Sequence, residues 1–595
     1  MHRRLLLLVG ATAAVLLLAA SATARTKVAA TPAIVGGTPA AAPFAQAWAQ
    51  VPTTTAGRMA ANVAVVGAEQ DVNGFNTQLA GENQLWGGFM GALEAQHGAF
   101  LQNEKGVWIP DLVASASANS KSVTYNIKPT ANWYWGGKKV PVTYKDFVYT
   151  LQKIDDPNSL VAGRNGYSNL DPTKFTHKGN KQVTFFWKTK NCSTDFPCGA
   201  YANWQSIFSG IYPSFALQGA DFNKIWSSCI CGNDGQPVSS GPYYMANYTK
   251  GQGSVLKANP FWYGKKPALN EIDFKIIADT NSEEEAMRGG EVDMIDPTFG
   301  LYLAPLKTTP GLTYATLPGY YFEHLEFREG NAPGGSSVNK GASNKLLRAP
   351  WFREAISMGI DRQSIINTVY GQLAGGTTPM NGALYYQTQD GYTTPFTKWN
   401  FNPTKALATL KKHCTGGPSS VSPSNSQIWQ CSGLPASIFW TWTASNSVRT
   451  TTEQIVKQEL KSIGIEVKDK PLPANVVFGP TGIPSGDFDV AEFAEITDGD
   501  PSTWTSLYGC KLDGNYTGFC SHTFDNLMKA GNGELDPAKR KADYQKADKV
   551  LASIVPIMPL YQRPSPIIYK STLLGVVNAP TTFGPFWNIE QWHWK

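Results

Sequence analysis

Residues 122–157, SVTYNIKPTANWYWGGKKVPVTYKDFVYTLQKIDDP, contain the clearest helix signal in the chain. Thr143, with Asp146 three residues later, has the pattern of a capping box, in which each side chain satisfies a free backbone amide of the first turn. Phe147, Leu151 and Ile154 then fall on one helical face. Asp156-Pro157 ends the pattern, so we predict an amphipathic helix between Thr143 and this dipeptide.

Similar signals extend outward from this stretch in both directions. Capped helices are predicted after Asp361, Asn402-Pro403 and Asp536-Pro537, and Gly371 ends the first of these. Another helix, beginning near Thr452, runs to Gly464 and leads into a strand at Ile465 and Val467. Val63, Val65 and Val66 predict the first strand. Strands and helices alternate without a fixed-period repeat, which indicates α/β domains rather than a solenoid.

Length and composition favour a globular protein of several domains. The 595 residues suggest about three to four domains at roughly 150 residues each. With 42% hydrophobic and 16% charged residues, the chain has enough apolar material to fold. The net charge of +6 is dispersed without a basic run, so a nucleic-acid partner is not expected.

The N-terminus has the pattern of an export signal. Arg3-Arg4 precede an apolar run, Leu5 to Ala20, and Ala22-Thr23-Ala24 offers a small-residue cleavage site. The run has about 16 residues against the roughly 20 needed to span a bilayer, so a signal peptide over 1–24 is preferred to a membrane anchor. The first cysteine is Cys192, so no lipid-anchor cysteine lies near the cleavage site.

The segment that follows, residues 25–58, is rich in Ala, Thr, Pro and Gly. It has few large apolar side chains with which to offset the entropy of ordering, so a flexible linker is expected there.

Eight cysteines support an oxidising compartment and predict four disulfides. Cys414 with Cys431, and Cys510 with Cys520, are each isolated in sequence and are predicted to pair. Cys192, Cys198, Cys229 and Cys231 allow three connectivities, which stay open. The Cys229-Ile230-Cys231 spacing does not match a zinc site, and no metal is expected.

Five blocks of sequence carry a resemblance to a known family. They are 122–157; the stretch from SGPYYM at 240 through LKANPFWYGKKPALNEIDFKII to GGEVDMI at 295; REAISMGIDRQSIINTVYG at 353–371; GDFDVAEFAEITDGDP at 486–501; and FDNLMKAGNGELDPAKRKADYQKADKVLASIVPIMPLY at 524–561. In these blocks and in their order, the chain resembles the family 5 extracellular solute-binding proteins of bacterial ABC importers, which include dipeptide- and oligopeptide-binding proteins.

The resemblance implies a two-lobed α/β fold of the periplasmic-binding-protein kind, with an inserted domain and a ligand cleft between the lobes. Domain I is expected from 59–85, 236–318 and 557–595, domain II (the insertion) from 86–235, and domain III from 319–556. The strands near Tyr320–Phe327 and Ile557–Tyr561 are the expected hinge.

The function that the resemblance implies is capture of short peptides outside the cytoplasm and their delivery to ABC permease subunits. A monomer without a cofactor is expected, in the periplasm or the extracellular space of the cell envelope. The alternative is the same fold binding an opine, an oligosaccharide, haem or a nickel complex, because a fold does not fix its ligand.

The candidate ligand residues follow from the cost of burying charged peptide termini. In peptide-binding relatives, an aspartate just before an acid-proline dipeptide holds the ligand ammonium, and Asp498 and Asp500 stand before Pro501 here. Asp498 lies three residues before the proline where the relatives usually have four, and a turn or helix cap is the alternative for both aspartates.

Three further residues are weaker candidates. Trp440 and Trp442 alternate on one side of a predicted strand and are candidates to line the cleft, with core packing as the alternative. Arg449, expected just ahead of the helix near Thr452, is a candidate for a ligand carboxylate, with a solvated flank as the alternative.

A secreted hydrolase is the remaining alternative and finds little support. The seven histidines are scattered without an H-E-x-x-H motif, and the chain has no G-x-S-x-G elbow and no Walker A loop. The acids Glu492 and Glu495 could serve a glycosidase. Pairs of acids also arise by chance among 45 acidic residues, so no catalytic residue is expected.

Overall fold

The computed structural model describes residues 51–190, 192, 198–330, 344–512 and 514–595. The expected signal peptide and most of the expected linker lie outside these residues. The last part of the linker is corrected, because helix α2 begins at Thr55 and its Arg58 is buried against Asp293, with Nη2 to Oδ1 2.6 Å. An arginine fixed by a distant carboxylate cannot belong to a free linker.

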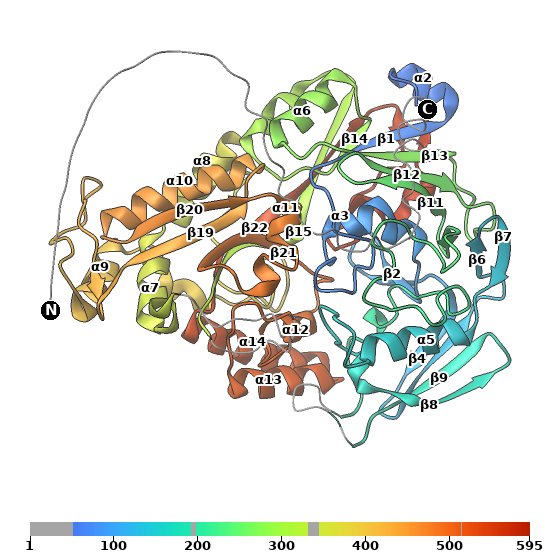
Figure 1. Ribbon diagram of the computed structural model, residues 1–595, viewed down its shortest axis with the longest axis horizontal. Helices are drawn as coiled ribbons and strands as arrows, with labels where there is room; N and C mark the ends of the chain where they lie inside the picture. The colour runs from blue at the N-terminus through green and yellow to red at the C-terminus, as the bar shows by residue number, and fades with distance from the viewer. Residues whose placement is uncertain (1–50, 191, 193–197, 331–343, 513) are drawn as a thin grey trace, which may run out of the picture. The chain divides into compact units, whose positions relative to one another are not determined.

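A ten-stranded mixed sheet organises the described chain (Figure 1). Its strands, in spatial order, are β11 (Tyr243–Thr249), β12 (Gly253–Ala258), β13 (Glu271–Ile276), β1 (Val63–Ala68), β14 (Met294–Ile295), β22 (Ile557–Lys570), β15 (Leu312–Phe327), β21 (Val490–Ile496), β19 (Ser437–Thr443) and β20 (Glu466–Leu472). We call the five strands β11, β12, β13, β1 and β14 the first strand group, and β21, β19 and β20 the second strand group. The long strands β22 and β15 lie between them.

Smaller sheets and ribbons complete the β-structure. They are β4 (Val113–Ala118), β5 (Ser122–Ile127), β9 (Gln182–Trp187) and β8 (Leu170–Lys178); β10 (Val238–Ser239), β6 (Asn132–Trp135) and β7 (Lys138–Pro141); β16 (Cys414–Thr415), β17 (Gln430–Cys431) and β18 (Leu434–Pro435); β2 (Phe100–Gln102) with β3 (Trp108–Pro110); and β23 (Leu573–Leu574) with β24 (His593–Trp594). The β6–β7 hairpin turns at Gly136-Gly137, both with positive φ, which suits a tight two-residue turn.

The helices are α2 (Thr55–Ala61), α3 (Leu85–Gly87), α4 (Leu93–Ala95), α5 (Tyr144–Asp155), α6 (Thr280–Gly289), α7 (Pro350–Gly359), α8 (Arg362–Tyr370), α9 (Pro403–His413), α10 (Ser447–Ser462), α11 (Ala474–Val477), α12 (Trp504–Tyr508), α13 (His522–Gly533) and α14 (Pro537–Ile554). Five of the helices, α5, α8, α9, α10 and α14, are those that the sequence predicts. Thr143 and Asp146 form the predicted capping box of α5. Asp361, Asn402 and Asp536 cap α8, α9 and α14 as predicted.

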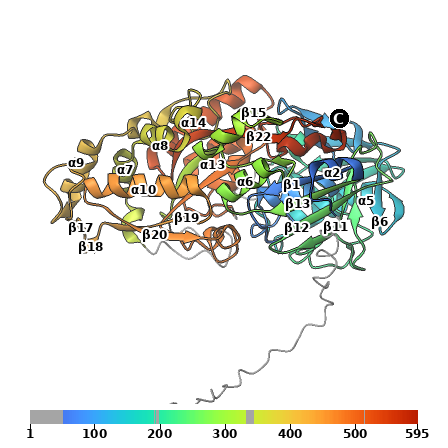
Figure 2. The same cartoon turned by 90° about the horizontal axis from the view of Figure 1, so that it is seen from above.

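Two large apolar cores lie on either side of β1. Val65 packs into one core, with residues of β15, β22 and the second strand group, whereas Ala64 and Val66 pack into the other, with residues of the 86–235 segment. A strand buried on both faces requires a continuous apolar run, which explains the valines that signalled it. Figure 2 shows α10 lying along β19 and β20, and this helix closes the first of these cores.

Candidate functional site

The pair β15–β22 connects the two strand groups and defines the centre of the candidate site. The strands pair antiparallel in two stretches, Leu312–Pro318 with Lys570–Pro564 and Phe322–Glu326 with Gln562–Ile557. The register shifts between Pro318 and Phe322, so the ladder is interrupted near Tyr320. Gln562 Nε2 donates to the Gly319 carbonyl at 2.8 Å and holds the strands together at this interruption.

A buried ion network lies beside this interruption. Arg449 Nε contacts Glu323 Oε1 at 2.6 Å, and Arg563 Nη1 lies 3.5 Å from Glu323 Oε2. All three side chains are less than a tenth exposed. Burial alone would raise the pKa of Glu323, but Arg449 and Arg563 outweigh it and hold the pKa below its usual value. Glu323 is therefore an ionised carboxylate whose charge is already compensated within the protein.

The position of Arg449 corrects its expected environment. Helix α10 begins at Ser447, not near Thr452, because Asn446 caps it by accepting from the Arg449 amide at 3.1 Å. Arg449 therefore lies in the first turn and is 7% exposed, so a solvated flank is wrong. Its guanidinium is held by Glu323 and by the hydroxyl of Thr443. The capping signal Asn446, present in the sequence, could have placed this residue correctly.

Trp440 and Trp442 belong to the packed core. Both project from the same face of β19 and are 0% and 4% exposed. Their indole nitrogens donate to Glu492 Oε2 at 3.2 Å and to Thr450 Oγ1 at 3.1 Å. Each ring is therefore packed in the interior with its indole nitrogen hydrogen-bonded, as the core-packing alternative predicts.

The candidate aspartates form a turn directly after β21. Asp498 Oδ1 accepts hydrogen bonds from the Asp500 amide at 3.0 Å and the Thr503 hydroxyl at 2.9 Å, and Oδ2 accepts from Asn203 Nδ2 at 2.8 Å. Asp500 accepts from the Ser502 amide at 2.9 Å and caps a short 3-10 turn, Pro501–Thr503. Asp498 therefore stabilises the turn and Asp500 caps the short helix that follows, so each side chain has the local role given by the alternative interpretation.

The electrostatics distinguish Asp498 from an ordinary turn residue. Burial, and then the charge of Asp500, raise the pKa of Asp498 to about 6. In the described part of the chain Asp498 accepts three hydrogen bonds from neutral groups and forms no ion pair. Its ionised form is therefore left without a compensating positive charge.

Residues of the expected insertion reach this turn. Gln102 Nε2 donates to the Asp498 carbonyl at 2.7 Å, Asn165 Nδ2 donates to the Ser502 carbonyl at 3.0 Å, and the Tyr201 hydroxyl donates to Ser502 Oγ at 2.8 Å. Asn203, whose contact with Asp498 is given above, completes the group. Sequence reasoning missed these residues, and their polar types alone carry no signal for this role.

The carboxylates that could have suggested a glycosidase do not form a pair. Glu492 and Glu495 stand three residues apart on β21, opposite Leu325 and Phe322 of β15. Because side chains alternate along a strand, positions three apart face opposite sides of the sheet. Glu492 meets Trp440 on one face, and Glu495, whose pKa is raised to about 8 by burial and then by Glu326, lies on the other.

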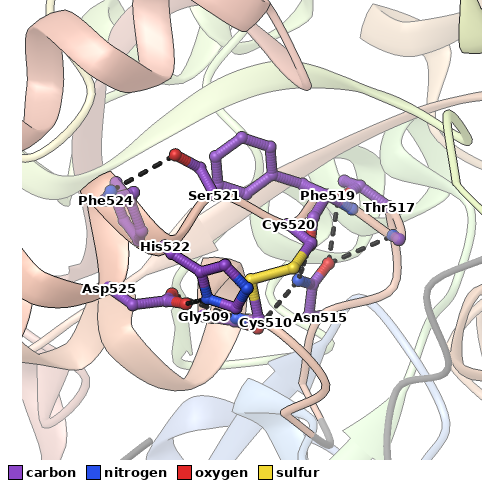
Figure 3. The surroundings of a disulfide bond; sticks show 11 residues. Gly509, Cys510, Asn515, Thr517, Phe519, Cys520, Ser521, His522, Phe524 and Asp525 are labelled. Carbon is purple, nitrogen blue, oxygen red and sulfur yellow. Dashed lines mark hydrogen bonds and ion pairs between the residues drawn. A yellow bond between two sulfur atoms is a disulfide. The ribbon is translucent and has the colours of Figure 1, made fainter.

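The disulfides confirm the two predicted pairs. Cys414 pairs with Cys431 and Cys510 with Cys520, and the open set resolves into Cys192–Cys198 and Cys229–Cys231. Figure 3 shows the Cys510–Cys520 bond beside Asn515, whose amide donates to the carbonyls of Gly509 and Phe519. His522 and Asp525 lie near Cys510, but its sulfur is bonded to Cys520 and cannot act as a thiolate ligand.

The sequence match and the fold together place the chain among extracellular solute-binding proteins. Residues 107–518 match the family described as bacterial extracellular solute-binding proteins, family 5, and the chain belongs to that family. In the described residues no helix is long and apolar enough to cross a membrane.

Relatives and solved structures agree with this assignment. The oligopeptide-binding protein OppA of Mycobacterium tuberculosis is 25% identical over 76% of this chain and 71% of its own length. An oligopeptide-binding protein of Thermus thermophilus, solved with a pentapeptide, has a TM-score of 0.74 at 19% identity, covering 90% of this chain and 97% of that one. NikZ of Campylobacter jejuni, solved with Ni(L-His), has a TM-score of 0.73 at 15% identity, covering 90% and 99%.

Proposed function

We propose that this protein captures short peptides and delivers them to ABC permease subunits in the cell membrane. Membership of the solute-binding family supports binding rather than catalysis, and the named oligopeptide-binding relative favours peptide over other solutes. The export signal predicted over residues 1–24 supports a location in the periplasm or the extracellular space of the cell envelope.

The observation that carries the ligand class is the uncompensated carboxylate of Asp498. A peptide ammonium brings both a positive charge and hydrogen-bond donors, and it would replace neutral donors with a charge-assisted contact. Asp498 lies two residues after the end of β21, so a peptide whose ammonium meets this carboxylate would lie close to a strand end, and an extended peptide backbone can pair with a strand. Asp500, whose carboxylate caps Ser502, is the weaker candidate for this contact.

Arg449, Trp440 and Trp442 take supporting roles in this proposal. Arg449 holds Glu323 at the junction of the strand groups, and the two indoles pack beneath the same region. These buried side chains brace the strands behind the site and do not contact the peptide.

The hinge is proposed at the interruption between β15 and β22. Domain I (59–85, 236–318 and 557–595) and domain III (319–556) would move about these two strands, with the insertion 86–235 moving together with domain I. The register shift near Tyr320 supports this placement, because few ladder hydrogen bonds resist bending there.

A thermal-shift screen tests the ligand class. The purified mature protein is heated with peptide mixtures and, in parallel, with opines, oligosaccharides, haem and nickel complexes such as Ni(L-His). A peptide at about 100 times its dissociation constant should stabilise the fold by roughly 2.7 kcal/mol.

Intact recovery of the peptide and a smaller radius of gyration on binding would support the proposal. Stabilisation confined to a non-peptide class would reject peptide as the ligand while leaving the family unchanged. Steady cleavage of the peptide would instead make the protein a hydrolase.

A further inference from the structure

A surface hollow of about 400 Å³ is lined by residues of the segment 217–235, which follows the Cys192–Cys198 pair and precedes strand β10. Both Cys229 and Cys231 line it, together with Trp226 and the charged residues Asp221 and Lys224. Cys229 and Cys231 are each partly exposed, so the disulfide between them is open to small molecules from solvent. The hollow is formed by one continuous segment, and none of the candidate peptide-binding residues lines it.

The backbone around this disulfide is held by contacts that do not involve sulfur. Ile230, between the two cysteines, is 1% exposed and packs into the apolar core. Its carbonyl accepts from the Val238 amide at 3.0 Å, and the Cys231 carbonyl accepts from Trp226 Nε1 at 3.0 Å. Opening the sulfur–sulfur bond would leave all of these contacts in place.

The bridge itself adds little constraint to the chain. It joins residues only two positions apart, and the entropy that a cross-link removes from the unfolded chain falls as the closed loop shortens. The bond Cys414–Cys431 differs in both loop length and exposure. It closes a loop with a separation of 17 residues, and its cysteines are 8% and 0% exposed. A structural role explains Cys414–Cys431 and does not explain Cys229–Cys231.

Strained backbone lies next to the same site. Trp226 has φ of 61°, a left-handed conformation that is unusual for a bulky residue. Its ring stacks on Tyr212 with centroids 4.9 Å apart, and this packing fixes the strained residue. Strain of this kind persists where the surroundings over-determine it and is concentrated at functional sites.

We propose that Cys229–Cys231 is a reversible redox site and that the adjoining hollow admits a low-molecular-weight thiol. The thiolate of the incoming thiol attacks one sulfur of the bridge, forming a mixed disulfide and releasing the other cysteine as a thiolate, which takes up a proton. A second molecule of the thiol then attacks the mixed disulfide. The protein gains two electrons and two protons as a dithiol, and the small thiol leaves as its symmetrical disulfide.

The charged residues of the hollow suit this exchange. Lys224 lines the same hollow as the two cysteines, and a positive charge that reaches the leaving thiolate would favour the first step. Its ammonium lies 3.0 Å from Asp221 in a largely exposed pair, so the local charge remains close to neutral before the thiol arrives. Oxidised low-molecular-weight disulfide drives the same steps in reverse and restores the bridge.

Differential alkylation during reduction tests the proposal. The mature protein is treated with graded reduced glutathione, free thiols are blocked at timed intervals, and each cysteine peptide is quantified by mass spectrometry. Cys229 and Cys231 should become alkylated at least about tenfold faster than Cys414 and Cys431, with an unchanged circular dichroism spectrum. Oxidised glutathione should then close the bridge again. Reduction no faster than that of Cys414–Cys431, or reduction accompanied by loss of the folded spectrum, would overturn the proposal.

Two double variants provide a matched control. Replacing Cys229 and Cys231 together by Ser should change the Tm by no more than about 2 °C, whereas replacing Cys414 and Cys431 together by Ser should lower it by several degrees. A Cys229→Ser, Cys231→Ser variant that fails to fold, or that loses as much stability as the control, would make the bridge structural and reject the redox site. Peptide binding takes no part in either measurement, so this result does not depend on the proposed transport function.

Discussion

Glu323 on β15 and Asp498 just after β21 are two carboxylates in opposite electrostatic environments. Glu323 lies between Arg449 and Arg563, and its pKa is held below its usual value although burial opposes this. Asp498 has only neutral hydrogen-bond donors, and burial raises its pKa to about 6. The difference teaches that burial alone does not identify a ligand-binding carboxylate. The informative feature is whether the protein itself supplies the countercharge.

Replacing Glu323 by Ala should have the largest effect and should act on stability. It would leave Arg449 and Arg563 buried without their shared carboxylate, so the free energy of unfolding should fall by about 3–5 kcal/mol, as measured by urea denaturation. Glu466→Ala is the control, because its carboxylate faces Lys468 at 3.4 Å on the surface, and it should change stability by no more than about 0.5 kcal/mol. A loss below about 1 kcal/mol for Glu323→Ala would show that the arginines find other partners.

Replacing Asp498 by Ala should act on ligand affinity instead. A peptide ammonium left without its carboxylate should bind about 3–5 kcal/mol more weakly, while the fold survives. Asp500→Ala is the matched control and should bind the same peptide to within about 1 kcal/mol, because it loses only a cap. Calorimetry on a peptide found in the screen provides the measurement. If both variants bind as tightly as the parent, the anchor is elsewhere and both aspartates only shape the turn.

The pH dependence sharpens the same contrast. A peptide ammonium requires ionised Asp498, whose pKa of about 6 means that affinity should fall as the pH decreases below 6, by about tenfold per unit. The stability of the ligand-free protein should change in the opposite direction. Because the folded pKa is raised, the contribution of this group is fully present below its unfolded pKa and is lost as the pH rises through 6.

Asp498→Asn isolates both pH effects. This variant should lose the affinity change between pH 5 and 7 that is specific to Asp498. An affinity that varies with pH identically in the parent and in Asp498→Asn would assign the titration to another group.

The smallest effect is expected at Asn203. Its amide donates to Asp498 at 2.8 Å, in the position that a ligand ammonium would use. If the ligand displaces this amide, Asn203→Ala should bind peptide up to about 1 kcal/mol more tightly, because one hydrogen bond no longer has to break. Asn165→Ala removes a neighbouring contact to the Ser502 carbonyl without touching Asp498 and should leave affinity unchanged. A weaker affinity in Asn203→Ala would instead make Asn203 part of the bound site.

The local features of the fold could be predicted because their interactions span only a few residues. The capping box of Thr143 and Asp146 and the caps at Asp361 and Asp536 each join residues no more than three apart. Cys414 and Cys431 are close in sequence and isolated from other cysteines, so their pairing follows from proximity. The order of the five sequence blocks likewise indicated the family, which the match over residues 107–518 confirms.

The electrostatic character of the site depended on the tertiary structure. Arg449 meets Glu323 from 126 residues away, Asn203 meets Asp498 from 295 residues away, and Arg58 meets Asp293 from 235 residues away. No local pattern specifies such pairs, because each side chain has many possible partners until the sheet brings the strands together. The sequence by itself determined the capped helices, the isolated cysteine pairs and the family, because each depends on nearby residues or on the order of sequence blocks. Only the packed structure decided which buried charge is already paired and which is left for a ligand.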